Sequence, residues 1–89
     1  MASYRIEVSA TAEKQIRMLP RDDQLRVLRA IRPLATEPTP PGARKIRGYA
    51  DVFRIRVGTY RILYRVEGRR LVIIILKIGH RREIYRSLR

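Results

Sequence analysis

The first part of the chain changes from a strand-like to a helical pattern of apolar residues. Residues 4–8, Tyr-Arg-Ile-Glu-Val, alternate with a period of two and favour β-structure, so they predict a strand. Ala12, Ile16 and Leu19 then recur at i, i+4 and i+7, which is the spacing of one apolar helix face. Ser9 is a suitable N-cap for this helix, and the proline after Leu19 should end it.

A second apolar stripe at helical spacing predicts another helix, which begins near Pro20. The stripe consists of Leu25, Leu28, Ile31 and Leu34. Pro33 should weaken the last turn, because it lacks a backbone N–H and its ring crowds the carbonyl four residues earlier. Residues 36–42, Thr-Glu-Pro-Thr-Pro-Pro-Gly, fit neither periodicity and predict a loop before the following strands.

Three strands are predicted in the second half of the chain. They are Val52 to Val57, Tyr60 to Val66, and Leu71 to Ile78. The last is apolar at nearly every position, which is typical of a central strand covered on both faces. We therefore expect a single α+β domain over residues 1–89, in the order β-α-α-β-β-β. An antiparallel sheet should pack on the two N-terminal helices, and a short helical segment should follow at the C-terminus.

A two-residue turn at Gly58-Thr59 would sort the side chains of the first hairpin onto two faces. Val57 would then face Tyr60, and Arg56 would face Arg61. Four arginines share the face that points away from the helices, and we call them the basic platform: Arg54, Arg56, Arg61 and Arg65. Opposed like charges destabilise a sheet, so this arrangement suggests a function. The alternative is a solvated edge on which the arginines spread apart.

An apolar strip should lie beside the basic platform on the same face. It consists of Leu63, Val72, Ile74 and Leu76. Aliphatic side chains next to arginines suit a segment of a protein partner that is both acidic and apolar. In the alternative, the chain's own C-terminal segment, Ile84 to Leu88, folds back over the strip.

The net charge adds a polyanionic partner to this picture. The chain has 21 Lys and Arg residues against 8 Asp and Glu, a net charge of +13. Residues 44–89 hold fourteen basic and three acidic side chains, whereas residues 1–43 hold seven and five. Ribosomes, RNA and DNA are all suitable partners. Lysine occurs at three positions only, and arginine can hold phosphate with two hydrogen bonds, although GC-rich coding also favours arginine.

Several classes of site are missing from the sequence. Without cysteine there is no disulfide, thiolate zinc site or cysteine nucleophile. No metal-ligand cluster, glycine-rich phosphate loop or Ser/His/Asp set is visible, so no metal and no cofactor are expected. The longest apolar stretch, residues 71–76, is far below the roughly 18 residues of a membrane span, and the N-terminus lacks a signal-peptide pattern. We expect a cytoplasmic protein with no membrane partner.

The last strand is followed by residues 79–86, Gly-His-Arg-Arg-Glu-Ile-Tyr-Arg, which contain the only histidine. RNA cleavage by the substrate's own 2′-hydroxyl needs a base, cations on the phosphate oxygens and an acid at the leaving 5′ oxygen. Arginines supply the cations. His80 suits either proton transfer, or is a structural or merely exposed residue. Tyr85 can orient the hydroxyl, act as a base or stack on a nucleobase, or is an ordinary boundary tyrosine.

Three segments together resemble the RelE/ParE toxin superfamily. They are Ala-Arg-Lys-Ile-Arg-Gly-Tyr at 43–49, Val-Phe-Arg-Ile-Arg-Val-Gly-Thr-Tyr-Arg-Ile-Leu-Tyr at 52–64, and Ile-Gly-His-Arg-Arg-Glu-Ile-Tyr-Arg at 78–86. The resemblance covers essentially the whole chain, including the Leu-Pro between the two helices. It implies a toxin that a cognate antitoxin neutralises by wrapping around it. RelE-type members enter the ribosomal A site and cut mRNA, leaving a 2′,3′-cyclic phosphate and a 5′-hydroxyl.

The resemblance also implies roles for particular residues. Arg54 and Arg56 match two basic residues on the first hairpin strand, Arg61 matches the arginine of the next strand, and Arg81 and Tyr85 match a C-terminal arginine and tyrosine. The expected catalytic residues are Arg61, Arg81, Tyr85 and His80. The expected RNA and phosphate contacts are Arg54, Arg56, Arg65, Arg44, Lys45, Arg47 and Arg82, and the expected antitoxin contacts are Leu63, Val72, Ile74 and Leu76.

The two hairpin positions depart from RelE itself, where both are often lysine. Arginine at 54 and 56 keeps phosphate binding but is a poor general base, so His80 is retained as a candidate for proton transfer.

The expected function is a ribosome-dependent endoribonuclease toxin. Its partners would be a cognate antitoxin, the ribosome and mRNA, with operator DNA bound only through the antitoxin complex. One alternative is the ParE branch, which inhibits DNA gyrase by binding and cuts no RNA. Another is an inactive toxin that serves, with its antitoxin, only as an autorepressor. Arg81 and Tyr85 favour the RelE branch, because a pure binder has no use for a tyrosine beside phosphate-binding arginines.

Overall fold

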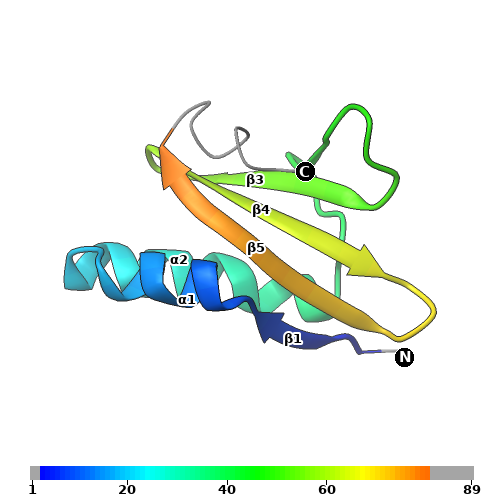
Figure 1. The fold of residues 1–89 in the computed structure, drawn as a ribbon, viewed down its shortest axis with the longest axis horizontal. Helices are drawn as coiled ribbons and strands as arrows, with labels where there is room; N and C mark the ends of the chain where they lie inside the picture. Colours follow the sequence, from blue (N-terminus) through cyan, green and yellow to red (C-terminus); the bar gives the residue numbers. More distant parts are fainter. Residues whose placement is uncertain (1–2, 81–89) are drawn as a thin grey trace.

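A computed structural model describes residues 3–80, which form five strands and two α-helices (Figure 1). The strands are β1 (Arg5–Val8), β2 (Arg44–Lys45), β3 (Val52–Val57), β4 (Tyr60–Glu67) and β5 (Val72–His80). The helices are α1 (Ala10–Arg17) and α2 (Arg21–Ile31), and a short 3-10 helix, η1 (Arg32–Ala35), follows. The predicted α+β fold is confirmed. The predicted C-terminal helical segment lies outside the described residues.

The strands of residues 3–80 make one sheet in the order β1-β5-β4-β3-β2. β3, β4 and β5 are antiparallel neighbours, as predicted. β1, however, pairs with β5 in parallel, so the sheet is mixed and the prediction of an antiparallel sheet was wrong for β1. The parallel pairing places Ile6 opposite Ile73, which adds an aliphatic row next to the central strand. β2 was not predicted, because a two-residue strand carries no periodicity.

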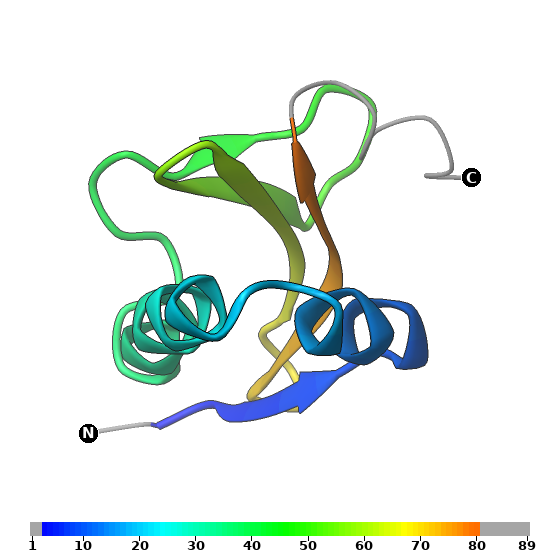
Figure 2. The same ribbon diagram turned by 90° about the vertical axis from the view of Figure 1, so that its left-hand side faces the viewer.

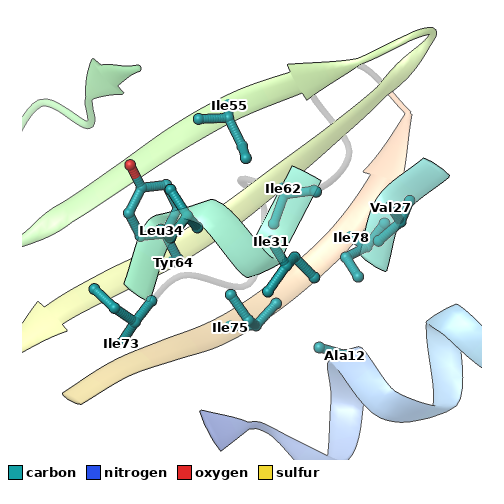
Figure 3. Close-up of a cluster of buried hydrophobic side chains, with 10 residues drawn as sticks. All are labelled: Ala12, Val27, Ile31, Leu34, Ile55, Ile62, Tyr64, Ile73, Ile75 and Ile78. Carbon is teal, nitrogen blue, oxygen red and sulfur yellow. The ribbon is translucent and has the colours of Figure 1, made fainter. Parts of the chain in front are cut away.

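Both helices cover the same face of the curved sheet and lie side by side (Figure 2). The core between these layers is aliphatic except for one tyrosine, Tyr64 (Figure 3). Its members are Ala12, Val27, Ile31, Leu34, Ile55, Ile62, Tyr64, Ile73, Ile75 and Ile78. β5 contributes three isoleucines to it and lies inside the sheet, between β1 and β4.

The residues of helix α2 that face the core differ from the predicted apolar stripe. Val27 is fully buried, whereas Leu25 and Leu28 are 44% and 45% exposed. Val27, Ile31 and Leu34 are spaced i, i+4 and i+7, so they form the narrow face that meets the sheet. The leucine stripe was therefore wrong for its first two members. The expected effect of proline in the last turn is confirmed, because the α-helix ends at Ile31 and gives way to η1.

Two polar side chains, one at the N-cap of α1 and one within α1, form hydrogen bonds to the backbone of β5 past the residues that pair with β1. The hydroxyl of Ser9 accepts a hydrogen bond from the Ala12 N–H at 3.0 Å, as an N-cap does, and donates to the carbonyl of Leu76 at 2.9 Å. The side-chain oxygen of Gln15 accepts from the Ile78 N–H at 2.8 Å. These bonds satisfy backbone groups of β5 and fix the strand end against the helix.

Tyr64 makes the stability of the fold sensitive to alkaline pH. Its ring is fully buried and its hydroxyl donates a hydrogen bond to the carbonyl of Pro38 at 2.7 Å. Burial raises the pKa of the Tyr64 phenol from 10.0 to about 12. Because the folded-state pKa exceeds the unfolded value, this contribution is complete below pH 10 and is lost as the pH rises toward 12.

We therefore expect Tyr64→Phe to lose less stability than the wild-type chain when the pH rises from 8 to 11. The difference should be roughly 1 kcal/mol in the free energy of unfolding, measured by urea denaturation at both pH values. At pH 8 the variant should be less stable by about 1 kcal/mol, because it lacks the hydrogen bond to Pro38. Equal alkaline losses in the two proteins would contradict the assigned role of the phenol.

Candidate functional site

The pairing of β3 with β4 places the basic platform as predicted. Arg56 lies opposite Arg61, Arg54 opposite Leu63, and Val52 opposite Arg65. The alternating residues of both strands, among them Ile55 and Ile62, are buried in the core. Since successive residues of a strand point to opposite faces, Arg54, Arg56, Arg61 and Arg65 share the face that points away from the helices.

Two further cations flank the basic platform. Arg44 of β2 pairs with Arg54, and Lys77 of β5 pairs with Leu63. One row across the sheet therefore carries Arg44, Arg54, Leu63 and Lys77. Sequence reasoning missed Lys77, because simple alternation along β5 would turn Leu76 outward and Lys77 inward. The signal that could have found it is the charge itself, since a lysine is a poor choice for the core side of this strand.

A register shift explains the position of Lys77. Leu63 pairs with Lys77 while the next residue, Tyr64, pairs with Ile75, so Leu76 is the extra residue of a β-bulge. Val72 and Ile74 lie on the outer face, opposite Glu67 and Arg65.

Burial differs within the predicted apolar strip. Leu63 and Val72 are fully buried, whereas Ile74 and Leu76 are only partly buried. A segment that docks on this face could therefore reach Ile74 and Leu76 directly. Glu7 and Glu67, which belong to the same face by register, each form an ion pair with an arginine outside the platform, Arg5 and Arg70.

Three of the four platform arginines are not neutralised by carboxylates of the described part of the chain. Within residues 3–80, Arg54, Arg56 and Arg65 form no ion pair. Arg54 and Arg65 are partly buried on the sheet and Arg56 is exposed. Their charges are thus available to an anion, and guanidinium groups bind phosphate oxygens with paired hydrogen bonds.

Two hollows bring the predicted residues together. One, of about 240 Å³, lies at the β3–β4 turn and is lined by Arg56, Gly58, Thr59, Tyr60 and Arg61. The other, of about 470 Å³, lies along the loop between β2 and β3 and is lined by Lys45, Ile46, Arg47, Gly48, Tyr49 and Ala50. The first joins the two opposed arginines of the platform. The second joins two of the predicted phosphate contacts with an aromatic ring, Tyr49.

His80 lies at the end of the sheet beside the platform. β5 extends two residues further than predicted, so His80 is its last residue and pairs with Tyr60, while Gly79 pairs with Arg61. The rings of Tyr60 and His80 are 4.4 Å apart between centroids. His80 is exposed and follows Tyr60 onto the helix side of the sheet rather than the platform side. Arg81, Arg82 and Tyr85 lie outside the described residues.

Tyr60 and Asp23 join this corner of the molecule and were not predicted as site residues. The Tyr60 hydroxyl donates a hydrogen bond to Oδ2 of Asp23 on α2, at 2.8 Å. This bond, then burial and the charge of the carboxylate, raise the pKa of the Tyr60 phenol above its usual value. Tyr60 therefore stays protonated near neutral pH and acts as a hydrogen-bond donor, not as a base.

Residues 3–80 contain neither a membrane-spanning helix nor a metal-binding cluster of side chains. No helix there is long and apolar enough to cross a bilayer. No three His, Cys, Asp or Glu side chains of this range gather in a group that could hold a metal ion.

The fold and the charged sheet face define the class: this is a small α+β protein whose outward-facing arginines suit a polyanionic partner. Residues 6–85 match the family model described as the ParE toxin of the type II toxin-antitoxin system parDE. The chain belongs to this family and so to the RelE/ParE toxin superfamily, which makes it a toxin of a type II toxin-antitoxin system.

Individual relatives agree with this assignment. The chain is 34% identical over 84 residues to toxin RelG of Mycobacterium tuberculosis, covering 93% of this chain and 97% of RelG. The RelBE2 toxin-antitoxin complex of the same organism matches with a TM-score of 0.79 and 29% identity, over 90% of this chain and 100% of that chain. The archaeal RelE–RelB complex of Pyrococcus horikoshii matches with a TM-score of 0.80 and 31% identity, over 91% and 98%.

Proposed function

We propose that this toxin is a ribosome-dependent endoribonuclease that cuts mRNA in the A site and so inhibits translation in the cytoplasm. The observation that carries the proposal is the basic platform, in which Arg56 and Arg61 face each other at the rim of a hollow of about 240 Å³. A hollow with two guanidinium groups suits one phosphodiester of a strand whose neighbouring phosphates contact the rest of the platform. The similarity to RelG and to RelE structures supports the same conclusion.

The proposed reaction is attack by the substrate's own 2′-hydroxyl on the adjacent phosphorus. A bond forms between O2′ and phosphorus, the bond to O5′ breaks, and the products are a 2′,3′-cyclic phosphate and a 5′-hydroxyl. Arg61, helped by Arg56 and Arg81, would stabilise the negative charge that develops on the phosphate oxygens. A base must accept the 2′-hydroxyl proton, and an acid must protonate O5′.

Proton transfer is assigned to residues at the end of β5 and after it in the sequence. Arginine stays protonated, so neither Arg54 nor Arg56 is a suitable base. We assign this chemistry to His80 and Tyr85, of which His80 is exposed and follows directly after the residue paired with Arg61. The remaining cations would hold RNA phosphates on either side of the cut: Arg54, Arg65, Arg44, Lys45, Arg47 and Arg82.

A cognate antitoxin would bind across the same face. The RelBE2 and RelE–RelB structures are both complexes of a toxin with its antitoxin. On this chain an acidic and apolar segment could pair with the platform arginines and cover Ile74 and Leu76, next to Leu63 and Val72. Occupation of the platform would exclude RNA, and operator DNA would be bound only through the antitoxin.

The test is to add the purified chain to ribosomes stalled on a defined mRNA and to map new 5′ ends. We expect cuts confined to the A-site codon and no cuts in the same RNA without ribosomes. Intact mRNA, on ribosomes that a known RelE toxin does cleave, would contradict the proposal.

A second candidate, inhibition of DNA gyrase, is favoured by the family model itself, which is named for ParE. A supercoiling assay run in parallel separates the two. Loss of supercoiling together with intact mRNA would establish the ParE-like activity, and neither effect would point to an inactive toxin.

A further inference from the structure

Three residues from three elements form a connected chain at one corner of the sheet. Asp23 of α2 accepts a hydrogen bond from the Tyr60 hydroxyl at 2.8 Å. Tyr60 of β4 meets the ring of His80 with centroids 4.4 Å apart and planes inclined by 39°. Tyr60 and His80 are also direct partners in the β4–β5 pairing. A helix of one layer is thereby connected to the last residue of β5 in the other layer.

We propose that Asp23 and Tyr60 are positioning residues that hold the imidazole of His80 at the end of β5, next to the hollow that Tyr60 lines together with Arg56 and Arg61. This inference rests on the proposed endoribonuclease function and extends it to two residues that are not among its proposed catalytic or phosphate-binding residues. An exposed histidine on a strand end is otherwise free to change rotamer, and a proton-transfer group must be held in a defined orientation. The Tyr60 ring restricts His80, and the Asp23 carboxylate restricts the Tyr60 ring.

The same contacts also fix the turn that carries the opposed arginines. Tyr60 lines the hollow of about 240 Å³ together with Arg56 and Arg61. Arg26, one turn after Asp23 on α2, lies close to the turn as well, since its Nη1 is 3.9 Å from the position that a Cβ on Gly58 would occupy. Helix α2 therefore meets the tip of the hairpin at two places. A shift of Tyr60 would move the imidazole relative to the phosphate-binding arginines.

The phenol is suited to this role because it does not titrate near neutral pH. Its hydrogen bond to Asp23, burial and the nearby carboxylate all keep it protonated. It therefore remains a donor to Asp23 under the conditions in which ribosomes work, and its ring keeps one orientation beside His80. Aromatic rings in tilted contact at this separation attract each other.

The experiment uses the fact that His80 is the only histidine of the chain, so its imidazole signals in an NMR spectrum of the untagged protein are unambiguous. Tyr60→Leu removes the ring, and Asp23→Ala removes the acceptor. Asp23→Asn keeps a carbonyl oxygen that can still accept from the phenol. Asp22→Ala is the control, because Asp22 is the exposed neighbour in the same turn of α2.

In Tyr60→Leu the His80 signals should lose their ring-current shift, and kcat for A-site cleavage should fall roughly ten- to hundredfold with little change in KM. The value of KM should stay nearly the same because the arginines that bind RNA are retained. Asp23→Ala should change the His80 signals and lower kcat less than Tyr60→Leu does. Asp23→Asn should recover much of the lost kcat and of the His80 signal position. Asp22→Ala should match the wild-type chain in both measurements.

Each outcome bears on the inference. Unchanged His80 signals in Tyr60→Leu, or changed signals with full cleavage, overturn it while the proposed function stands. If Tyr60→Leu does not fold, Asp23→Ala supplies the same comparison, because its side chain lies outside the core. A wild-type chain that cuts no mRNA overturns the proposed function and with it the catalytic purpose of the contact, whereas the NMR comparison still reports whether the imidazole is held.

Discussion

Arg61→Ala is expected to reduce ribosome-dependent cleavage of mRNA by roughly 10²- to 10³-fold, the usual effect of removing one preorganised donor from a developing anion. The free energy of unfolding should change by about 1 kcal/mol or less, because Arg61 lies on the outer face and outside the core. Relief of its repulsion with Arg56 partly offsets any contact that is lost. Initial rates on stalled ribosomes and urea denaturation measure the two quantities.

The matched control for this prediction is Arg29→Ala. Arg29 is an exposed arginine of α2, on the helix layer, and its removal changes the net charge by the same amount. It should leave cleavage nearly unchanged. Arg61→Lys should recover only part of the activity, since an ammonium group keeps the charge but not the paired hydrogen bonds. If Arg29→Ala were as damaging as Arg61→Ala, net charge rather than the platform would be responsible.

The sequence predicted the hairpin of the platform in detail because a short turn leaves little freedom. Gly58 adopts a positive φ of 59°, which glycine tolerates readily, and the turn fixes the register of both strands. With the register set, the alternation of Arg54, Arg56 and Arg61 with aliphatic residues determines which face is charged. Local rules were sufficient here.

β5 was predicted less well because it is apolar at nearly every position. Such a strand carries no alternation of polar and apolar residues, so a bulge at Leu76 leaves no trace in the sequence. The sequence also does not indicate whether β1 pairs with β5 in parallel or antiparallel, because Ile6 would be buried equally well in either direction. The stripe of α2 failed for a related reason, since Leu25 and Leu28 are as apolar as the residues that do meet the sheet.

The site could be predicted only where its residues are close in sequence or share a strand. Asp23 and Tyr60 are 37 residues apart and meet through the packing of a helix on a sheet. In the sequence, an aspartate in the first turn of a helix is already explained by its favourable interaction with the helix dipole. Nothing in the pattern distinguished Asp23, which contacts Tyr60, from its exposed neighbour Asp22.

Ile73→Ala is expected to destabilise the fold by about 2–5 kcal/mol, through lost burial and the cavity that remains. Ile73 is 0% exposed, pairs with Val66 and Ile6, and belongs to the core cluster on the interior strand β5. A chain of 89 residues has a total stability of roughly 4–13 kcal/mol at typical values per residue, so this one change could unfold the protein. Urea denaturation with unchanged slope would measure the loss.

Ile74→Ala is the matched control, because it removes the same atoms from the next residue of the same strand. Ile74 is only partly buried and points to the outer face, so about 1 kcal/mol should be lost. The order should reverse for antitoxin binding, which Ile74→Ala should weaken while Ile73→Ala, in whatever fraction remains folded, should not. Equal losses of stability would mean that the two faces of β5 are wrongly assigned, and the outer face would then no longer account for both RNA and antitoxin binding.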